Sequence, residues 1–206
     1  IGNTSLFYNS AELYDGLLKV NNFAVGAKVS ERIALGAFVR SLTTDQIEIT
    51  TMTQPDGTGQ YYDFSDTDIG VAFAYRATKR FSIGAKVHAV SEKIGQSSAS
   101  TVLIDVSTDY RISYANIRIT TLFENFGADA KYAGNDLWAT VDPTPPNDTS
   151  LPIDYTDLNR RYSLNTREFA PPTRIAIGVR GDVIGENAPV ILEGNVVSLF
   201  TGMQKM

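Results

Sequence analysis

The strongest constraint on this chain is a period-two alternation of apolar and small or polar residues, which runs through most of the sequence after residue 22. Side chains of a β-strand point alternately to opposite faces, whereas a helix repeats every 3.6 residues. A clear example is segment 69–75, where Ile69, Val71, Phe73 and Tyr75 alternate with Gly70, Ala72 and Ala74. The pattern therefore predicts an all-β fold.

The alternating segments occur in pairs, which predicts antiparallel hairpins in an up-and-down order. The pairs are 23–29 with 33–39, 69–75 with 81–87, 102–112 with 117–123 around a turn at 114–116, and 175–179 with 190–196. Segment 11–20 fits a strand or a short helix, and we favour the strand. Turns within the first three hairpins are tight, whereas 44–67 and 128–172 are predicted as long loops, with 93–99 as a shorter link.

Charged residues of these strands fall on one face, while the other face is free of charge. The charged face holds Lys28, Arg40, Arg76, Lys86, Asp105, Asp109, Arg111, Arg118, Glu124, Arg174, Arg180 and Asp182. This division fits a soluble β-sandwich with one solvated face, and it fits a membrane β-barrel with a charged lumen. The many Gly and Ala residues of the charged face and the aromatic residues near the tight turns favour the barrel. These aromatics are Tyr75, Phe81, Tyr110 and Tyr114.

Composition excludes several other classes. The net charge of −5 argues against a nucleic-acid partner, which needs clustered Lys and Arg. The absence of cysteine excludes disulfides, zinc ribbons and thiol nucleophiles. No segment is apolar over the roughly 18 residues that a spanning helix requires. We therefore expect neither an enzyme nor a cofactor.

Candidate chemistry is sparse. His88 is the sole histidine and is interpreted as a polar residue facing the lumen. Asp105 and Asp109 share a strand face, but about 13 Å separates them at roughly 3.3 Å per residue, too far for a carboxylate pair. The acidic run 63–68 lacks the spacing of a calcium loop and is interpreted as a solvated loop edge.

Two groups of residues are predicted to carry function. A mixed-sign network inside the barrel is predicted from Lys86, Asp105, Arg111, Arg118 and Glu124, since buried charges persist when they are paired. Docking of a protein partner is predicted for the long loops, through the aromatic and arginine side chains typical of interface hot spots. These are Tyr61, Tyr62, Phe64, Trp138, Tyr155, Arg160, Arg161 and Tyr162.

An ordered set of segments resembles the PorV-like branch of FadL-type outer-membrane β-barrels. The set comprises Gln54-Pro55-Asp56-Gly57-Thr58-Gly59, Asp68-Ile69-Gly70-Val71, Thr78-Lys79-Arg80-Phe81-Ser82-Ile83, Glu124-Asn125-Phe126-Gly127 and Pro171-Pro172-Thr173-Arg174-Ile175. The resemblance covers about residues 45 to 182.

The resemblance implies an antiparallel transmembrane barrel in a bacterial outer membrane, in contact with its lipid. It further implies a role as an accessory or cargo-shuttle protein of a type IX-like secretion system, with secretion proteins or cargo signal domains as partners. Two alternatives stay open: FadL-like transport of hydrophobic small molecules, and a soluble secreted β-sandwich or structural subunit. Residues 1–206 are expected to form one domain or a fragment of a larger barrel.

Overall fold

The computed structural model describes residues 4–113, 117–141, 160–182 and 191–200, in which the chain is built from β-strands with one short 3-10 turn. Ten strands form the main sheet. They are β1 (Thr4–Leu13), β2 (Leu18–Lys28), β3 (Ile33–Thr44), β6 (Phe64–Arg76), β7 (Phe81–Ile94), β8 (Ser97–Arg111), β9 (Arg118–Gly127), β13 (Thr173–Asp182), β14 (Ile191–Phe200) and the short β10 (Ala133–Gly134) beside β8.

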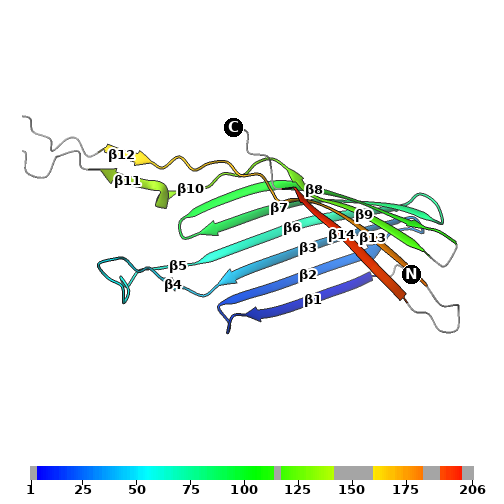
Figure 1. Cartoon of the computed structure of the whole chain (residues 1–206), viewed down its shortest axis with the longest axis horizontal. Coiled ribbons are helices and arrows are strands. Elements are labelled where there is room, and N and C mark those ends of the chain that lie inside the picture. Colours follow the sequence, from blue (N-terminus) through cyan, green and yellow to red (C-terminus); the bar gives the residue numbers. More distant parts are fainter. Residues whose placement is uncertain (1–3, 114–116, 142–159, 183–190, 201–206) are drawn as a thin grey trace, which may run out of the picture.

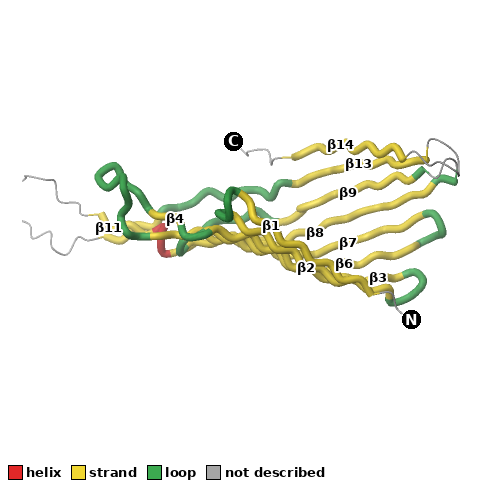
Figure 2. Tube along the Cα trace, turned by 90° about the horizontal axis from the view of Figure 1, so that it is seen from below, coloured by secondary structure: helices red, strands yellow, loops and turns green. Residues whose placement is uncertain are grey.

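Each long strand of this sheet pairs with the long strand that follows it in the sequence, always antiparallel. The order is β1-β2-β3-β6-β7-β8-β9-β13-β14, and the sheet is strongly curved (Figures 1 and 2). The predicted all-β, up-and-down antiparallel fold is therefore confirmed. Within the described ranges β1 and β14 do not pair with each other, so these two strands are the edges of the sheet.

The predicted hairpins correspond to β2–β3, β6–β7, β8–β9 and β13–β14, although residues 114–116 of the third turn lie outside the described residues. Segment 11–20 holds the end of β1, a turn and the start of β2. Tyr14, Asp15 and Gly16 all adopt positive φ in that turn. The link predicted over 93–99 is shorter than expected, because Gly95 has a φ of 57° and allows a two-residue turn.

The two long connections carry structure of their own. The one predicted over 44–67 narrows to residues 45–63, because β3 and β6 extend into it, and it contains the hairpin β4 (Ile47–Glu48) and β5 (Tyr61–Tyr62). The one predicted over 128–172 contains β10, a 3-10 turn (Asn135–Leu137), β11 (Trp138–Val141) and β12 (Arg160–Ser163). Both hairpins extend beyond the main sheet at the same end (Figure 1).

Burial in this sheet is the reverse of that in a soluble core. Large apolar side chains of one face are exposed, with Ile69 at 57% and Val71 at 62% of their full accessible surface. The most buried residues on the other face include Asp68 and His88. Among the described residues, the only sheets besides the main one are the two-stranded pairs β4–β5 and β11–β12. A β-sandwich partner sheet is therefore not part of the described chain.

Gly70 allows close packing of the polar face. A Cβ at this position would lie 2.5 Å from the Cβ of His88 and 2.7 Å from the carbonyl oxygen of Val87. We expect Gly70→Ala to destabilise the protein by about 1–3 kcal/mol, because these neighbours cannot move away independently. Gly26→Ala is the matched control, since its nearest neighbour would be 3.8 Å away. Equal denaturant midpoints for the two variants would contradict this expectation.

Candidate functional site

A chain of polar contacts crosses the charged face of the sheet from β3 to β8. Arg40 donates to Asp68 at 2.9 Å, and the other carboxylate oxygen of Asp68 lies 2.7 Å from Nδ1 of His88. Nε2 of His88 lies 3.3 Å from Asp105, whose second oxygen is 2.5 Å from Nζ of Lys86. We call these five residues the polar cluster. Both nitrogens of His88 are engaged, so the ring is held in one orientation.

Strand register places these side chains together. Asp68 on β6 is directly opposite Arg40 on β3, and Lys86 on β7 is directly opposite Asp105 on β8. His88 is two residues from Lys86 and therefore lies on the same face. The residues directly opposite His88 are each two positions along their strand from Asp68 or Asp105, so the ring can bridge the two carboxylates.

A β-bulge in β9 completes the environment of Asp105. Ile104 pairs with Phe126 whereas Val106 pairs with Phe123, so β9 carries one extra residue at this point. Asn125 within the bulge has a φ of 60°, and its backbone N–H donates to Asp105 at 2.8 Å. Asn125 also donates through its side chain to the carbonyl oxygen of Pro172 at 3.1 Å. The bulge thus joins the polar cluster to the start of β13.

An aromatic ring covers the cluster beside Gly70. The centroid of the Phe38 ring lies 6.1 Å from that of His88 and 5.1 Å from Nζ of Lys86. The second distance is within the range of a cation–π contact. A cavity of about 430 Å³ adjoins the cluster and is lined by small side chains of β3 and β6 together with Lys86, Asp105 and Glu124.

The other predicted lumen residues form separate ion pairs. Arg118 contacts Asp109 at 2.5 Å, and Arg111 lies 3.7 Å from the same carboxylate. Glu124 pairs with Arg174 on β13. The structure therefore places Lys86 and Asp105 in one cluster, Arg111 and Arg118 in a second, and Glu124 in a third.

One residue of the polar cluster, Asp68, lies elsewhere than the sequence predicts. The acidic run 63–68 predicts a solvated loop edge that includes Asp68, but Asp68 lies within β6 and is 2% exposed. Arg40 lies on the charged face as predicted, and the structure adds Asp68 as its partner. The up-and-down order predicts that the strands around 33–39 and 69–75 are neighbours, which could have suggested the contact between Arg40 and Asp68. The register between these two strands, however, depends on where β6 begins.

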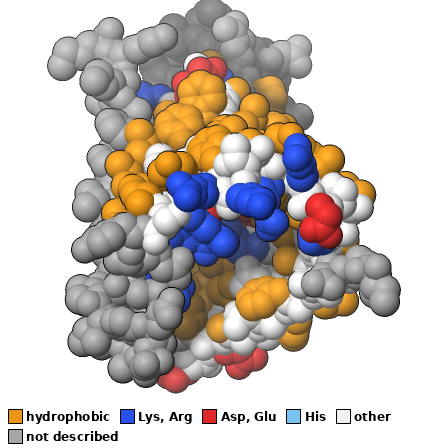
Figure 3. Space-filling model, turned by 90° about the vertical axis from the view of Figure 1, so that its right-hand side faces the viewer, with side chains coloured by type: hydrophobic (Ala, Val, Ile, Leu, Met, Phe, Trp, Pro, Cys, Tyr) orange, Lys and Arg blue, Asp and Glu red, His pale blue; other side chains and the backbone are white. Residues whose placement is uncertain are grey.

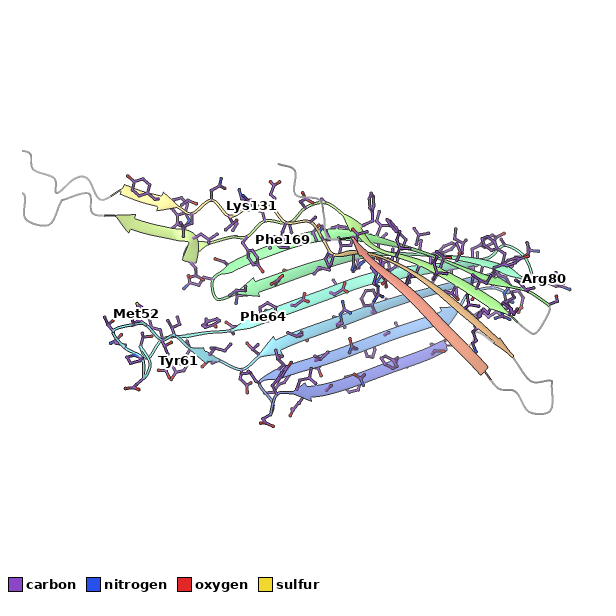
Figure 4. The ribbon with its side chains drawn as sticks, viewed as in Figure 1. Met52, Tyr61, Phe64, Arg80, Lys131 and Phe169 are labelled. Atoms are coloured by element: carbon purple, nitrogen blue, oxygen red, sulfur yellow. The ribbon has the colours of Figure 1, made fainter. Side chains whose placement is uncertain are left out.

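The predicted docking residues lie on the two projecting hairpins and the adjoining strand. Tyr61 and Tyr62 form β5, and Phe64 is the first residue of β6. Figure 4 shows Tyr61 on the same projecting segment as Met52, at the opposite end of the sheet from Arg80.

The second hairpin carries the other docking residues. Trp138 opens β11 and pairs in register with Ser163, while Arg160, Arg161 and Tyr162 belong to β12. The side chains of Trp138 and Tyr162 are about half exposed. Tyr155 lies outside the described residues.

The second connection is attached to the sheet through Tyr132. Its ring stacks on Phe169 with the centroids 5.7 Å apart. Burial raises the pKa of the Tyr132 hydroxyl, and the nearby Glu92 carboxylate, which accepts its hydrogen bond, raises it further. The contact with Glu92 attaches the base of the β11–β12 hairpin to β7, whereas the contact with Phe169 joins two parts of the same connection.

Comparison with family models, with curated proteins and with solved structures gives no significant match for this chain. No helix in the described part of the chain is long and apolar enough to cross a membrane. The same residues contain no group of three or more side chains placed to hold a metal ion.

Proposed function

We propose that this chain forms part of the wall of an outer-membrane β-barrel, with its apolar face in lipid and its polar face toward an aqueous lumen. The main supporting observation is the exposed apolar face that continues from β1 to β13, with charged residues such as Lys19 and Lys93 on that face only toward the ends of its strands. Its exposed side chains include Leu6, Val25, Leu35, Ile69, Val71, Phe73, Ile83, Val87, Val102, Ile104, Val106, Ile177 and Val179. Outward apolar and inward polar residues are the pattern of such barrels.

The height of the apolar face supports this proposal. On β8 the outward residues run from Val102 to Tyr110, and eight steps of about 3.3 Å make about 26 Å along the strand. A tilt of about 40° reduces this to about 20 Å, near the apolar band of about 25 Å in membrane barrels. Phe81 and Tyr110 lie where the apolar face meets the tight turns, and their ring centroids are 6.5 Å apart. Aromatic residues at this border are expected for an interfacial girdle.

The strand count constrains how such a barrel could close. The path from β1 to β14 passes through nine strands and therefore eight antiparallel junctions, which leaves β1 and β14 parallel to each other. Antiparallel closure consequently needs an odd number of further strands between these edges. A second copy of this sheet in the same membrane orientation cannot close the barrel by itself. Its two edge strands also run parallel to β1, so they would meet β1 and β14 in the parallel sense.

The proposed activity is non-enzymatic protein recognition, as an accessory or cargo-shuttle protein of a type IX-like secretion system in a bacterial outer membrane. The resemblance to PorV-like barrels supports the assignment to this secretion system. The two projecting hairpins support recognition of a protein partner. They place exposed aromatic side chains, such as Tyr61 and Tyr162, beyond the sheet at one end. A partner or cargo signal domain would dock there.

The membrane proposal predicts opposite environments for two adjacent residues of β8. Val106 points to the apolar face, and Ser107 lines the polar cavity. Because the chain has no cysteine, Val106→Cys and Ser107→Cys can each carry one fluorophore. In bilayers with nitroxide-labelled acyl chains, we expect strong quenching at 106 and weak quenching at 107. Equal quenching at both sites, or a monodisperse protein without detergent, would contradict the proposal.

The docking proposal predicts loss of secretion without loss of the barrel. Tyr61→Ala and Tyr162→Ala each remove an exposed aromatic anchor, and hot-spot truncations of this kind cost about 2 kcal/mol or more of binding. We expect cells that carry the double variant to retain cargo that normally reaches the cell surface. Met52→Ala is the control, because Met52 is fully exposed on the β4–β5 segment. Normal surface attachment in the double variant, at wild-type barrel level, would eliminate these hairpins as the docking site.

A further inference from the structure

The tight-turn end of the sheet brings three arginines into one row. Arg111 on β8 is directly opposite Arg118 on β9, and Arg118 is directly opposite Arg180 on β13. Directly opposite residues on adjacent strands have Cβ atoms about 5 Å apart and point to the same face. Figure 3 shows Lys and Arg side chains gathered at this end around a hollow in the surface.

Backbone hydrogen bonds extend this row along the neighbouring turns. The N–H of Arg111 donates to the carbonyl oxygen of Arg80 at 2.8 Å. The N–H of Arg76 donates to that of Arg32 at 2.7 Å. We call Arg32, Arg76, Arg80, Arg111, Arg118 and Arg180 the arginine arc. It runs from the β2–β3 turn to β13.

The arc is poorly neutralised within the described residues. Asp109 is shared between Arg111 and Arg118, and Glu31 contacts Lys28. No described acidic side chain forms an ion pair with Arg32, Arg76, Arg80 or Arg180. Like charges directly opposite each other destabilise a sheet, and the whole chain has a net charge of −5. On its other side Arg180 is directly opposite Glu193 of β14, so the row across β8, β9, β13 and β14 holds three arginines and one acidic residue.

A pocket of about 260 Å³ lies between two residues of the arc. Arg118 and Arg180 line it, together with Thr120, and Gly178 and Ala176 leave space there. The side chain of Arg118 is 43% exposed, so it can reach a ligand while contacting Asp109. Planar guanidinium groups bind phosphate oxygens in pairs. Arg118 and Arg180 therefore offer two such forks on one side of a pocket.

We propose that this pocket binds the phosphate group of a water-soluble ligand, with Arg118 and Arg180 as its principal contacts. Binding an anion relieves the repulsion among the three arginines in the row. A phosphate on a lipid headgroup has the same chemistry, but the pocket opens on the polar face, opposite to the face assigned to lipid. The site itself follows from strand register, and only the choice of a soluble ligand rests on the proposed membrane function.

Inorganic phosphate is the probe. The full chain, in micelles of an uncharged detergent, is titrated by calorimetry at constant ionic strength maintained with sodium chloride. We expect Arg180→Gln to weaken phosphate binding about tenfold or more, as for loss of a charge-assisted hydrogen bond. Arg167→Gln is the control, because it removes the same charge from an exposed loop residue outside the arc.

Thermal unfolding provides a second readout. Phosphate should raise the unfolding temperature of the wild type and of Arg167→Gln, but not that of Arg180→Gln. Without phosphate, Arg180→Gln should be about as stable as the wild type, because Arg180 is directly opposite a like charge, Arg118, on one side and an acidic residue, Glu193, on the other. This result would separate a binding role from a structural one.

Several results would overturn the proposal. They are wild-type affinity in Arg180→Gln, equal weakening in Arg167→Gln, and no saturable binding by the wild type. Binding to phosphatidylglycerol vesicles but not to inorganic phosphate would assign the arc to lipid headgroups instead. Binding to an acidic peptide but not to phosphate would assign it to a protein partner. A failure of the membrane test at Val106 and Ser107 would leave the phosphate titration interpretable, since that titration measures the site directly.

Discussion

Val71→Lys is expected to destabilise the bilayer-inserted protein by about 2–4 kcal/mol, the cost of a lysine at the lipid face near the membrane midplane. Val71 lies centrally on β6, points to the apolar face and is 62% exposed there. Neighbouring strands present Ala37 and Val87 directly opposite it. No acidic group stands in this row to pair with the introduced ammonium group.

Thr67→Lys is the matched control on the same strand and face. Thr67 is paired with Ser41 and Ser91, at the polar border of the apolar face. A lysine there should cost only about 0–1 kcal/mol, because its ammonium group reaches the interface. The measurement is reversible urea unfolding from vesicles. Equal costs at the two positions would contradict the assignment of this face to lipid.

Asp105→Ala is expected to destabilise the protein by about 3–5 kcal/mol, the range for breaking a buried ion pair. The carboxylate is 4% exposed and contacts Lys86, His88 and the backbone N–H of Asn125. Its removal leaves all three groups without this partner, and of these His88 is only 3% exposed. The effect follows from the unpaired groups that remain, so it does not measure the net value of the pair.

Two further variants test that interpretation. Asp45→Ala removes the carboxylate of an exposed ion pair with Lys19, at 2.8 Å, and should cost less than about 1 kcal/mol. Adding Lys86→Met to Asp105→Ala should recover part of the loss, with a coupling of about 1–3 kcal/mol. Similar unfolding midpoints for Asp105→Ala and Asp45→Ala would show that Asp105 contributes no more to stability than a carboxylate in an exposed ion pair.

The sequence predicts the strands of the site better than it predicts the contacts between those strands. The pairing of Lys86 with Asp105 and of Arg118 with Asp109 joins residues that alternation had placed on one face. For Asp68, in contrast, the sequence predicts a loop, because the start of β6 coincides with an acidic run. A strand boundary shifted by a few residues moves a carboxylate from solvent into the polar cluster.

What the sequence by itself determined is the strand content, the antiparallel order and the division into two faces. These follow from the two-residue period of a strand and from tight turns, which are local properties. Tertiary structure alone decided which polar residues meet. His88 joins Asp68 and Asp105 from two other strands, and Arg118 faces both Arg111 and Arg180. Those contacts depend on register, which is set by pairing between distant segments and by the bulge at Asn125, and a slip of a single residue would move every side chain to the opposite face.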